Sequence, residues 1–345
     1  MKAENRIGYQ TVEYKNKPLI AAYACAVGPR EGQGPLGDQF DLVAQSPEFG
    51  QESYEKAEAA LLREACHICL SKAGKGEKSI QAMLGGDLLN QIMASSLAAR
   101  ELKIPFLGLY GACSTMAESL LVGGMLCDGG YASPLLCTAG SHYATAERQY
   151  RYPLEYACQR TPAAQWTVTG AGAVMLSLDE NSEKKPRVRL VRGCMGRVVD
   201  MGIADANNMG AAMAPAAAAT LCAYFDDTKD DPRSFDRIIT GDLGMVGSEL
   251  LLEWSEKLGH PLPEEKMMDC GLTIFHPSQD SHAGGSGCGC AASVLCAHIL
   301  PKIERGEWKK VLFMATGALL SPTTSQQGET IPGIAHAVVI EGVQE

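Results

Sequence analysis

The chain alternates between short runs of apolar residues and longer segments in which apolar residues recur at helical spacing. Residues 54–73 carry apolar side chains three and four positions apart, which predicts a helix. Apolar runs bounded by turn residues predict buried strands at 134–140, 167–178, 310–317 and 335–342. Strands that alternate with helices in this way indicate an α/β protein whose parallel-rich sheets are covered by helices.

Three short segments of the first part of the chain recur in the same order in the second part. The polar segment DENSEKKPR, residues 179–187, lies between the two sets. We therefore predict two similar halves, 1–180 and 181–345, packed into one body. The matched pairs are AMLGGDLLNQI (82–92) with RIITGDLGMVGSELL (237–251), GACSTMAESLL (111–121) with GSGCGCAASVL (285–295), and PLLCTAG (134–140) with KVLFMATG (310–317).

Composition excludes several classes of protein. Hydrophobic residues make up 46% of the chain, but no run approaches the roughly 18 apolar residues of a membrane span. We also find no secretory signal at the N-terminus, which predicts a protein that stays inside its cell. The formal net charge of -10 argues against nucleic-acid binding, because the phosphate backbone demands a basic surface.

The sequence also lacks a complete motif for a metal site, a disulfide framework or a nucleotide cofactor. The CxxC of Cys66 and Cys69 and the CxC of Cys288 and Cys290 lack the second ligand pair of a structural zinc site, so we expect no metal. The thirteen cysteines have no disulfide-framework spacing and are predicted to be mostly reduced core residues. GAGA at 170–173 is too short for a dinucleotide fingerprint, so we expect no nicotinamide cofactor.

Cys113 is the strongest candidate for chemistry. It follows a predicted strand, stands between the small residues Ala112 and Ser114, and begins a predicted helix. The positive end of a helix lowers the pKa of a thiol, so this position is typical of a nucleophilic cysteine. The alternative is a small residue at a crowded turn, with no chemical role.

The order of LGLYGACSTMAESL, RIITGDLG, GGSGCGCAAS and ATGALLS resembles the thiolase and ketoacyl synthase superfamily over nearly the whole chain. This resemblance implies two pseudo-symmetric halves in an α-β-α-β-α arrangement of layers. It places the superfamily nucleophile at Cys113. It also implies a homodimer, with the interface expected at residues 133–142.

Two partners of that nucleophile are missing. Where ketoacyl synthase III relatives carry a histidine, this chain has Gly241 or Asp242, and where they carry an asparagine it has Cys288. Acyl condensation needs a base and an oxyanion stabiliser beside the thiolate, so we expect little activity. The rival interpretation is an acyltransferase in which His276 or His282 replaces the lost groups.

Longer stretches are similar to the stage V sporulation protein AD family of spore-forming bacteria, above all GLYGACSTMAESLLVGG and FHPSQDSHAGGSGCGCAAS. This resemblance implies a spore protein that binds dipicolinic acid, pyridine-2,6-dicarboxylate. It implies a soluble or peripheral subunit at the inner membrane of the forespore and spore. Its partners would be other stage V sporulation A proteins, which move dipicolinate during sporulation and germination.

A planar dianion requires cationic or polar donors for its carboxylates and an apolar slot for its ring. The candidate donors are Cys113, His142, Arg148, Arg151, Arg160, His276 and His282. Calcium is expected only together with bound dipicolinate. Surface ion pairs are the alternative for each arginine.

Asp87 and Asp242 occupy matching places in the repeated GDL segments. This symmetry favours a shared structural role, capping the helix that follows each strand, over metal binding.

Overall fold

The computed structural model describes residues 3–150, 160–179 and 187–343. Helices and strands alternate along most of the chain, as predicted. The strands are β1 (Thr11–Glu13), β2 (Leu19–Val27), β3 (Leu42–Val43), β4 (Ala82–Gly86), β5 (Phe106–Gly108), β6 (Leu135–Ser141), β7 (Trp166–Thr167), β8 (Gly170–Ser177), β9 (Val188–Cys194), β10 (Arg237–Thr240), β11 (Met267–Asp269), β12 (Gly285–Ser286), β13 (Lys310–Ala318) and β14 (Gly333–Gly342). The α-helices are α1 (Pro29–Gly32), α2 (Tyr54–Lys72), α3 (Met93–Leu102), α4 (Thr115–Asp128), α5 (Tyr143–Tyr150), α6 (Met209–Thr228), α7 (Gly244–Lys257), α8 (Cys270–Ile274), α9 (Cys288–Val294), α10 (Leu300–Glu304) and α11 (Pro322–Gln326).

The sheet repeats one topology twice. Five strands of the first part are ordered β5-β4-β6-β8-β2, and five of the second part are ordered β11-β10-β13-β14-β9. The directions match as well, since β4 is parallel to β5 and β6 while β8 is antiparallel to β6 and β2, and the second set repeats this pattern. The two sets meet where Leu19 of β2 pairs with Arg189 of β9.

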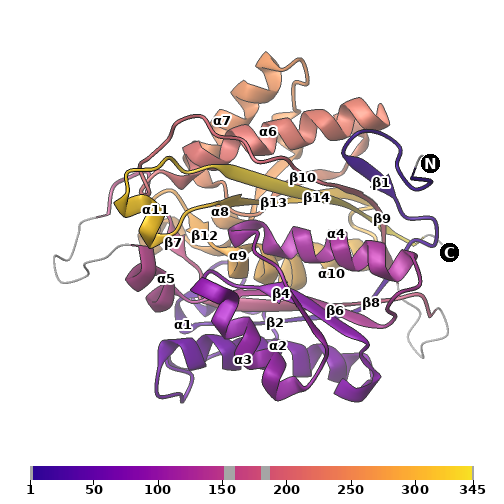
Figure 1. Cartoon of the computed structure of the whole chain (residues 1–345), viewed down its shortest axis with the longest axis vertical. Coiled ribbons are helices and arrows are strands. Elements are labelled where there is room, and N and C mark those ends of the chain that lie inside the picture. Colours follow the sequence, from indigo (N-terminus) through magenta and orange to yellow (C-terminus); the bar gives the residue numbers. More distant parts are fainter. Residues whose placement is uncertain (1–2, 151–159, 180–186, 344–345) are drawn as a thin grey trace.

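Five layers result, as Figure 1 shows: α2 and α3, then the first set of strands, then α4, α9 and α10, then the second set, then α6 and α7. A separate cluster of buried apolar side chains fills each of the outer gaps, and a third cluster surrounds the central helices. Burial on both faces explains why the strands are continuous apolar runs without alternation. The α/β class and the thiolase-like layering are confirmed. The predicted boundary at 180/181 lies outside the described residues and stays a prediction.

Strand β6 corrects the expected dimer interface at 133–142. It is hydrogen-bonded to β4 on one side and to β8 on the other, and all seven of its residues are buried. An interior strand has no free edge for a second copy, so that location is wrong. The free edge of this half is β5, which pairs with β4 alone among the described strands.

Among the described residues, no helix combines the length and the apolar character that crossing a membrane requires.

Candidate functional site

Cys113 lies between the two halves of the molecule. The chain leaves β5, makes a short 3-10 turn over Ala112–Ser114, and enters α4. Ala112 has a φ of 50°, in the left-handed region that non-glycine residues seldom adopt. Such strain persists only where the surrounding structure enforces it, and it is concentrated at functional sites. The cysteine itself is only 6% exposed.

The structure brings Asp242 to this cysteine. The Asp242 carboxylate accepts hydrogen bonds from the Gly287 N–H at 2.8 Å and from the Thr316 hydroxyl at 2.9 Å. It also interacts with the Cys113 thiol. Cys288, next along the chain from Gly287, donates its S–H to the Gly140 carbonyl at 2.9 Å. The residues at the positions of the lost superfamily partners are therefore adjacent to Cys113 in space.

This environment opposes a thiolate. Burial raises the pKa of Cys113 well above its ordinary value, and the nearby Asp242 and Cys288 raise it further. The expectation that the helix end produces a low-pKa thiol is therefore wrong, because burial and the neighbouring carboxyl disfavour the charged thiolate. Burial likewise raises the pKa of the Asp242 carboxyl to about 7. The surroundings of the Cys113 thiol are thus acidic, and no histidine of the described ranges is hydrogen-bonded to it.

The paired aspartates turn out to have different roles. Asp87 caps α3, since its carboxylate accepts the Ser95 N–H at 2.7 Å and the Leu89 N–H at 2.8 Å. The capping prediction is confirmed for Asp87 and wrong for Asp242. Asp269, at the end of the neighbouring strand β11, has the capping role at α7 instead. Its carboxylate accepts hydrogen bonds from the N–H groups of Leu243 and Gly244, where that helix begins. The Asp242 side chain is consequently free to face the site.

His276 and His282 both interact with neighbouring residues of one surface turn. His276 forms a capping box with Gln279. The His282 imidazole lies 3.5 Å from the Asp280 carboxylate. Neither imidazole is hydrogen-bonded to Cys113 or Asp242 in the described part of the chain, and the assignment of either as a base stays a prediction.

The structure does not bring the predicted arginines together at one site. Arg148, on α5, forms an ion pair with Glu55 on α2. Arg151 lies outside the described residues. Arg160 has its guanidinium 4.7 Å from the centre of the Trp166 ring. Only Arg160 of these three therefore lies beside an aromatic surface in the described structure.

A pocket of about 250 Å³ lies beside Trp166. Its walls are aromatic and charged, and the lining residues are Pro29, Arg30, Glu31, Pro47, Tyr54, His142, Tyr143, Ala144, Trp166 and Thr169. Tyr143 stacks on Trp166 at a centroid distance of 3.9 Å, and the Arg30 guanidinium lies 3.7 Å from the Trp166 ring centre.

Arg30 and Glu31 carry unsatisfied polar atoms here. The Nε of Arg30 is buried and has no hydrogen-bond partner among the described residues, while its Nη2 donates to the Gln279 carbonyl. Glu31 accepts the Thr169 N–H at 2.9 Å through Oε1, and its Oε2 is buried without a partner in the described structure. Burial raises the pKa of Glu31 to about 7. An unpartnered cationic donor in a pocket is a binding group for an anion.

His142 also lines this pocket, but both of its ring nitrogens are occupied. Nδ1 accepts the Ala144 N–H at 3.1 Å, and Nε2 lies 2.9 Å from the Pro47 carbonyl. Burial lowers the pKa of His142, which favours the neutral ring with the proton on Nε2. His142 therefore contributes shape to the pocket wall and no charge.

Sequence reasoning missed Arg30, Glu31 and Trp166. Arg30 stands in the segment GPREG, 136 positions before Trp166, and no local pattern joins them. The rarity of tryptophan was the available signal, since the chain has only three. A rare aromatic residue directly before an apolar strand is a candidate for a pocket wall.

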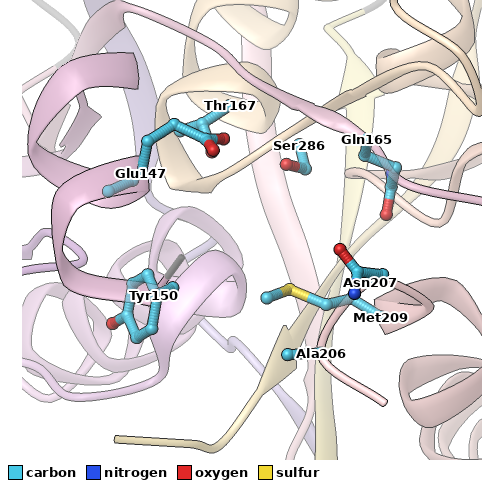
Figure 2. A pocket seen from close by; sticks show the side chains of 9 residues that line it. Glu147, Tyr150, Gln165, Thr167, Ala206, Asn207, Met209 and Ser286 are labelled. Carbon is cyan, nitrogen blue, oxygen red and sulfur yellow. The ribbon is translucent and has the colours of Figure 1, made fainter. Parts of the chain in front are cut away.

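Two further pockets lie near Cys113. One, of about 370 Å³, includes Asp87, Ala112 and Tyr150 in its wall. The other, shown in Figure 2, has room for about one water and lies between Glu147 and Tyr150 of α5 and the segment of Asn207 and Met209. Gln165 lines it and donates through its amide to the carbonyl of Asp242 at 2.8 Å. Neither pocket has a Lys, Arg or His among its described lining residues.

The described residues contain no group of three or more His, Cys, Asp or Glu side chains arranged to hold a metal ion. All twelve cysteines in the described ranges are buried and free.

Comparisons with known proteins agree with this geometry. The model of the family described as "Stage V sporulation protein AD" matches residues 8–341. The chain is 43% identical, over 334 residues, to the stage V sporulation protein AD of Bacillus subtilis, and the match covers 97% of each chain.

Solved structures resemble the fold at low sequence identity. The 3-oxoacyl-[acyl-carrier-protein] synthase III of Aquifex aeolicus aligns with a TM-score of 0.53 at 14% identity, covering 94% of this chain and 99% of its own. Human mitochondrial 3-ketoacyl-CoA thiolase aligns at 0.58 and 13%, covering 96% and 99%. Cerulenin-bound OleA of Xanthomonas campestris aligns at 0.61 and 14%, covering 96% and 98%. These likenesses show the thiolase-like fold.

Proposed function

This chain belongs to the stage V sporulation protein AD family, and from that premise we propose that it binds dipicolinic acid in spores without catalysing acyl transfer. In this proposal it is a soluble or peripheral subunit at the inner membrane of the forespore and spore. It acts with other stage V sporulation A proteins in moving dipicolinate during sporulation and germination.

The observation that carries the binding proposal is the pocket between Trp166 and His142. Its volume of about 250 Å³ accommodates a single pyridine ring with two carboxylates. Aromatic walls from Tyr54 and Trp166 suit the ring, and the unpartnered Nε of Arg30 suits a carboxylate. Arg160 adds a second positive charge beside the same tryptophan.

The surroundings of Cys113 are a poorer site for a dianion. Asp242 contacts the thiol, and Asp87 and Glu58 act on the neighbouring Cys288 through their charges. A carboxylate ligand placed there would meet acidic groups with no compensating cation among the residues named. We therefore place dipicolinate at Arg30 and regard Cys113 as the inherited position of a nucleophile. A covalent thioester at Cys113 after incubation with acyl-coenzyme A would contradict the non-catalytic part of this proposal and support the acyltransferase.

Calorimetric titration with dipicolinate across pH 6 to 9, with and without calcium, tests the binding proposal. We expect binding that weakens as the pH rises above about 7. The carboxyl of Glu31 has a pKa of about 7 in the free protein, and a bound dianion beside it raises that pKa further. Binding then takes up a proton, so affinity is greatest while Glu31 is protonated and falls by up to about tenfold per pH unit above 7.

The variant Glu31→Gln should bind with little dependence on pH, because the amide does not titrate. The Arg30 side chain is the same in both proteins. His142 is already neutral at its lowered pKa. Absence of any dipicolinate binding or stabilisation at millimolar ligand contradicts the proposed function. Binding that has the same pH dependence in both proteins contradicts only the role of Glu31.

We further propose a homodimer through the free edge of β5. The exposed fraction is 50% for Leu107 and 62% for Tyr110, and an open strand edge with apolar side chains offers unpaired backbone groups to which another chain can pair. Leu107→Glu should convert a particle of twice 36.7 kDa into one of 36.7 kDa in light scattering. Leu258→Glu, at a leucine that is 48% exposed at the end of α7, is the control and should leave the mass unchanged. A monomeric wild-type protein would contradict the dimer.

A further inference from the structure

A further pocket, of about 290 Å³, lies far from the Arg30 pocket, at the end of the molecule where β14 ends near the C-terminus (Figure 1). It forms where α10 ends, where β9 and β13 begin and where β14 ends. Its lining residues are Arg187, Ile303, Glu304, Arg305, Gly306, Trp308, Lys309, Gly342 and Val343. Three cationic side chains therefore meet in one hollow of a chain whose net charge is -10.

The charges of this pocket are only partly compensated. Arg305 donates to the Glu307 carboxylate at 2.6 Å, and Glu304 accepts a hydrogen bond from the hydroxyl of Tyr23. Arg187 and Lys309 make no side-chain hydrogen bond or ion pair within the described ranges. Arg305 follows a helix end, where a positive charge is favourable by itself. Arg187 and Lys309 precede strands, so helix stabilisation does not account for them.

Tertiary structure brings these two cations together. Arg187 stands directly before β9 and Lys309 directly before β13, 122 positions later in the chain. The Arg187 carbonyl accepts the Val343 N–H and the Lys309 carbonyl accepts the Gly342 N–H, both from the end of β14. These two hydrogen bonds hold the backbones of Arg187 and Lys309 on either side of β14.

We propose that this pocket binds a phosphate group, with the Arg187 guanidinium and the Lys309 ammonium as its donors. A guanidinium matches two phosphate oxygens at once, and an ammonium adds a point charge. Trp308, which is largely buried, lines the pocket, and its ring lies 4.9 Å from the Lys302 ammonium and 5.6 Å from the Arg237 guanidinium. Lys302 is itself paired with Glu307 at 3.5 Å, so the two donors proposed here are Arg187 and Lys309. The phosphate belongs either to a lipid headgroup or to a free phosphorylated compound.

The test uses the full chain with two probes, inorganic phosphate in calorimetry and vesicles of phosphatidate or of phosphatidylcholine in flotation. The double variant Arg187→Gln/Lys309→Gln should bind phosphate at least tenfold more weakly than the wild type. The control Lys56→Gln/Lys257→Gln removes the same charge from exposed helical lysines and should bind normally. Thermal unfolding of both variants verifies that they are folded.

Phosphatidate flotation that the pocket variant loses and the control retains assigns the site to a lipid headgroup. Phosphate binding without flotation assigns it to a free phosphorylated compound. The proposal is overturned if the wild type binds neither probe, if the pocket variant binds as the wild type does, or if the control loses binding equally. Neither variant touches the Arg30 pocket, so this test is independent of dipicolinate binding.

Discussion

Replacing Arg30 by glutamine should weaken dipicolinate binding by about 10- to 100-fold. A charge-assisted hydrogen bond contributes about 1.5 to 3 kcal/mol, and Arg30 offers its unpartnered Nε to the pocket. The substitution also removes the cation that covers Trp166 at 3.7 Å, so the aromatic wall loses its support. Calorimetric titration at pH 6.5, where Glu31 is mostly protonated, gives the affinities of both proteins.

Arg148→Gln is the matched control. Arg148 is paired with Glu55 on the surface, so this variant makes the same charge change at a residue that does not line the pocket. We expect its affinity to stay within about twofold of the wild type, in the range typical of surface substitutions. Equal losses in both variants would show a general charge effect. A loss in Cys113→Ser without a loss in Arg30→Gln would place the ligand at Cys113.

Asp269→Ala should lower the free energy of unfolding by about 3 to 5 kcal/mol, because it leaves several donors without their acceptor at a cost of about 1 to 3 kcal/mol for each buried one. The Asp269 carboxylate accepts from the Thr240 hydroxyl at 2.6 Å. It also accepts from the backbone N–H groups of Leu243, Gly244 and Leu272. Alanine leaves the Thr240, Leu243 and Gly244 donors buried without a partner and releases the turn that positions Asp242.

Urea unfolding followed by circular dichroism measures this change. Asp269→Asn keeps one acceptor oxygen and should lose less stability than the alanine variant. Asp87→Ala removes only two backbone hydrogen bonds at the matching helix, so its smaller loss serves as the internal comparison. A loss below about 1 kcal/mol for Asp269→Ala would contradict the network's contribution.

The regular elements were predictable because their signals are local. Helical spacing over 54–73 corresponds to α2, which runs over Tyr54–Lys72, and the apolar run at 310–317 corresponds to β13. Burial on both faces makes such strands continuously apolar, so they stand out from one-sided strands. The repeated segments also indicated that the two halves share one arrangement of strands, since equivalent strands recur in the same order along the chain.

The chemistry around Cys113 was predictable only in part. The residue pattern put Cys113 at the start of a helix, and the superfamily resemblance put Gly241 or Asp242 and Cys288 near it; the structure has Asp242 and Cys288 adjacent to Cys113. The direction of the thiol's pKa was wrong, because burial and the nearby carboxyl depend on residues distant in sequence. The role of Asp242 was also unpredictable, since Asp269 on a neighbouring strand takes the capping bonds.

By itself, the sequence determined the alternation of helices and strands, the repeat of the two halves and the position of Cys113. Each of these features depends on the pattern of residues that are close together in the sequence. Only the tertiary structure decided where a ligand pocket lies. Arg30 and Trp166 meet there across 136 positions of sequence, and their contact depends on how β7 and α1 pack. Long-range contacts of this kind leave no periodic pattern, so side-chain packing alone reveals them.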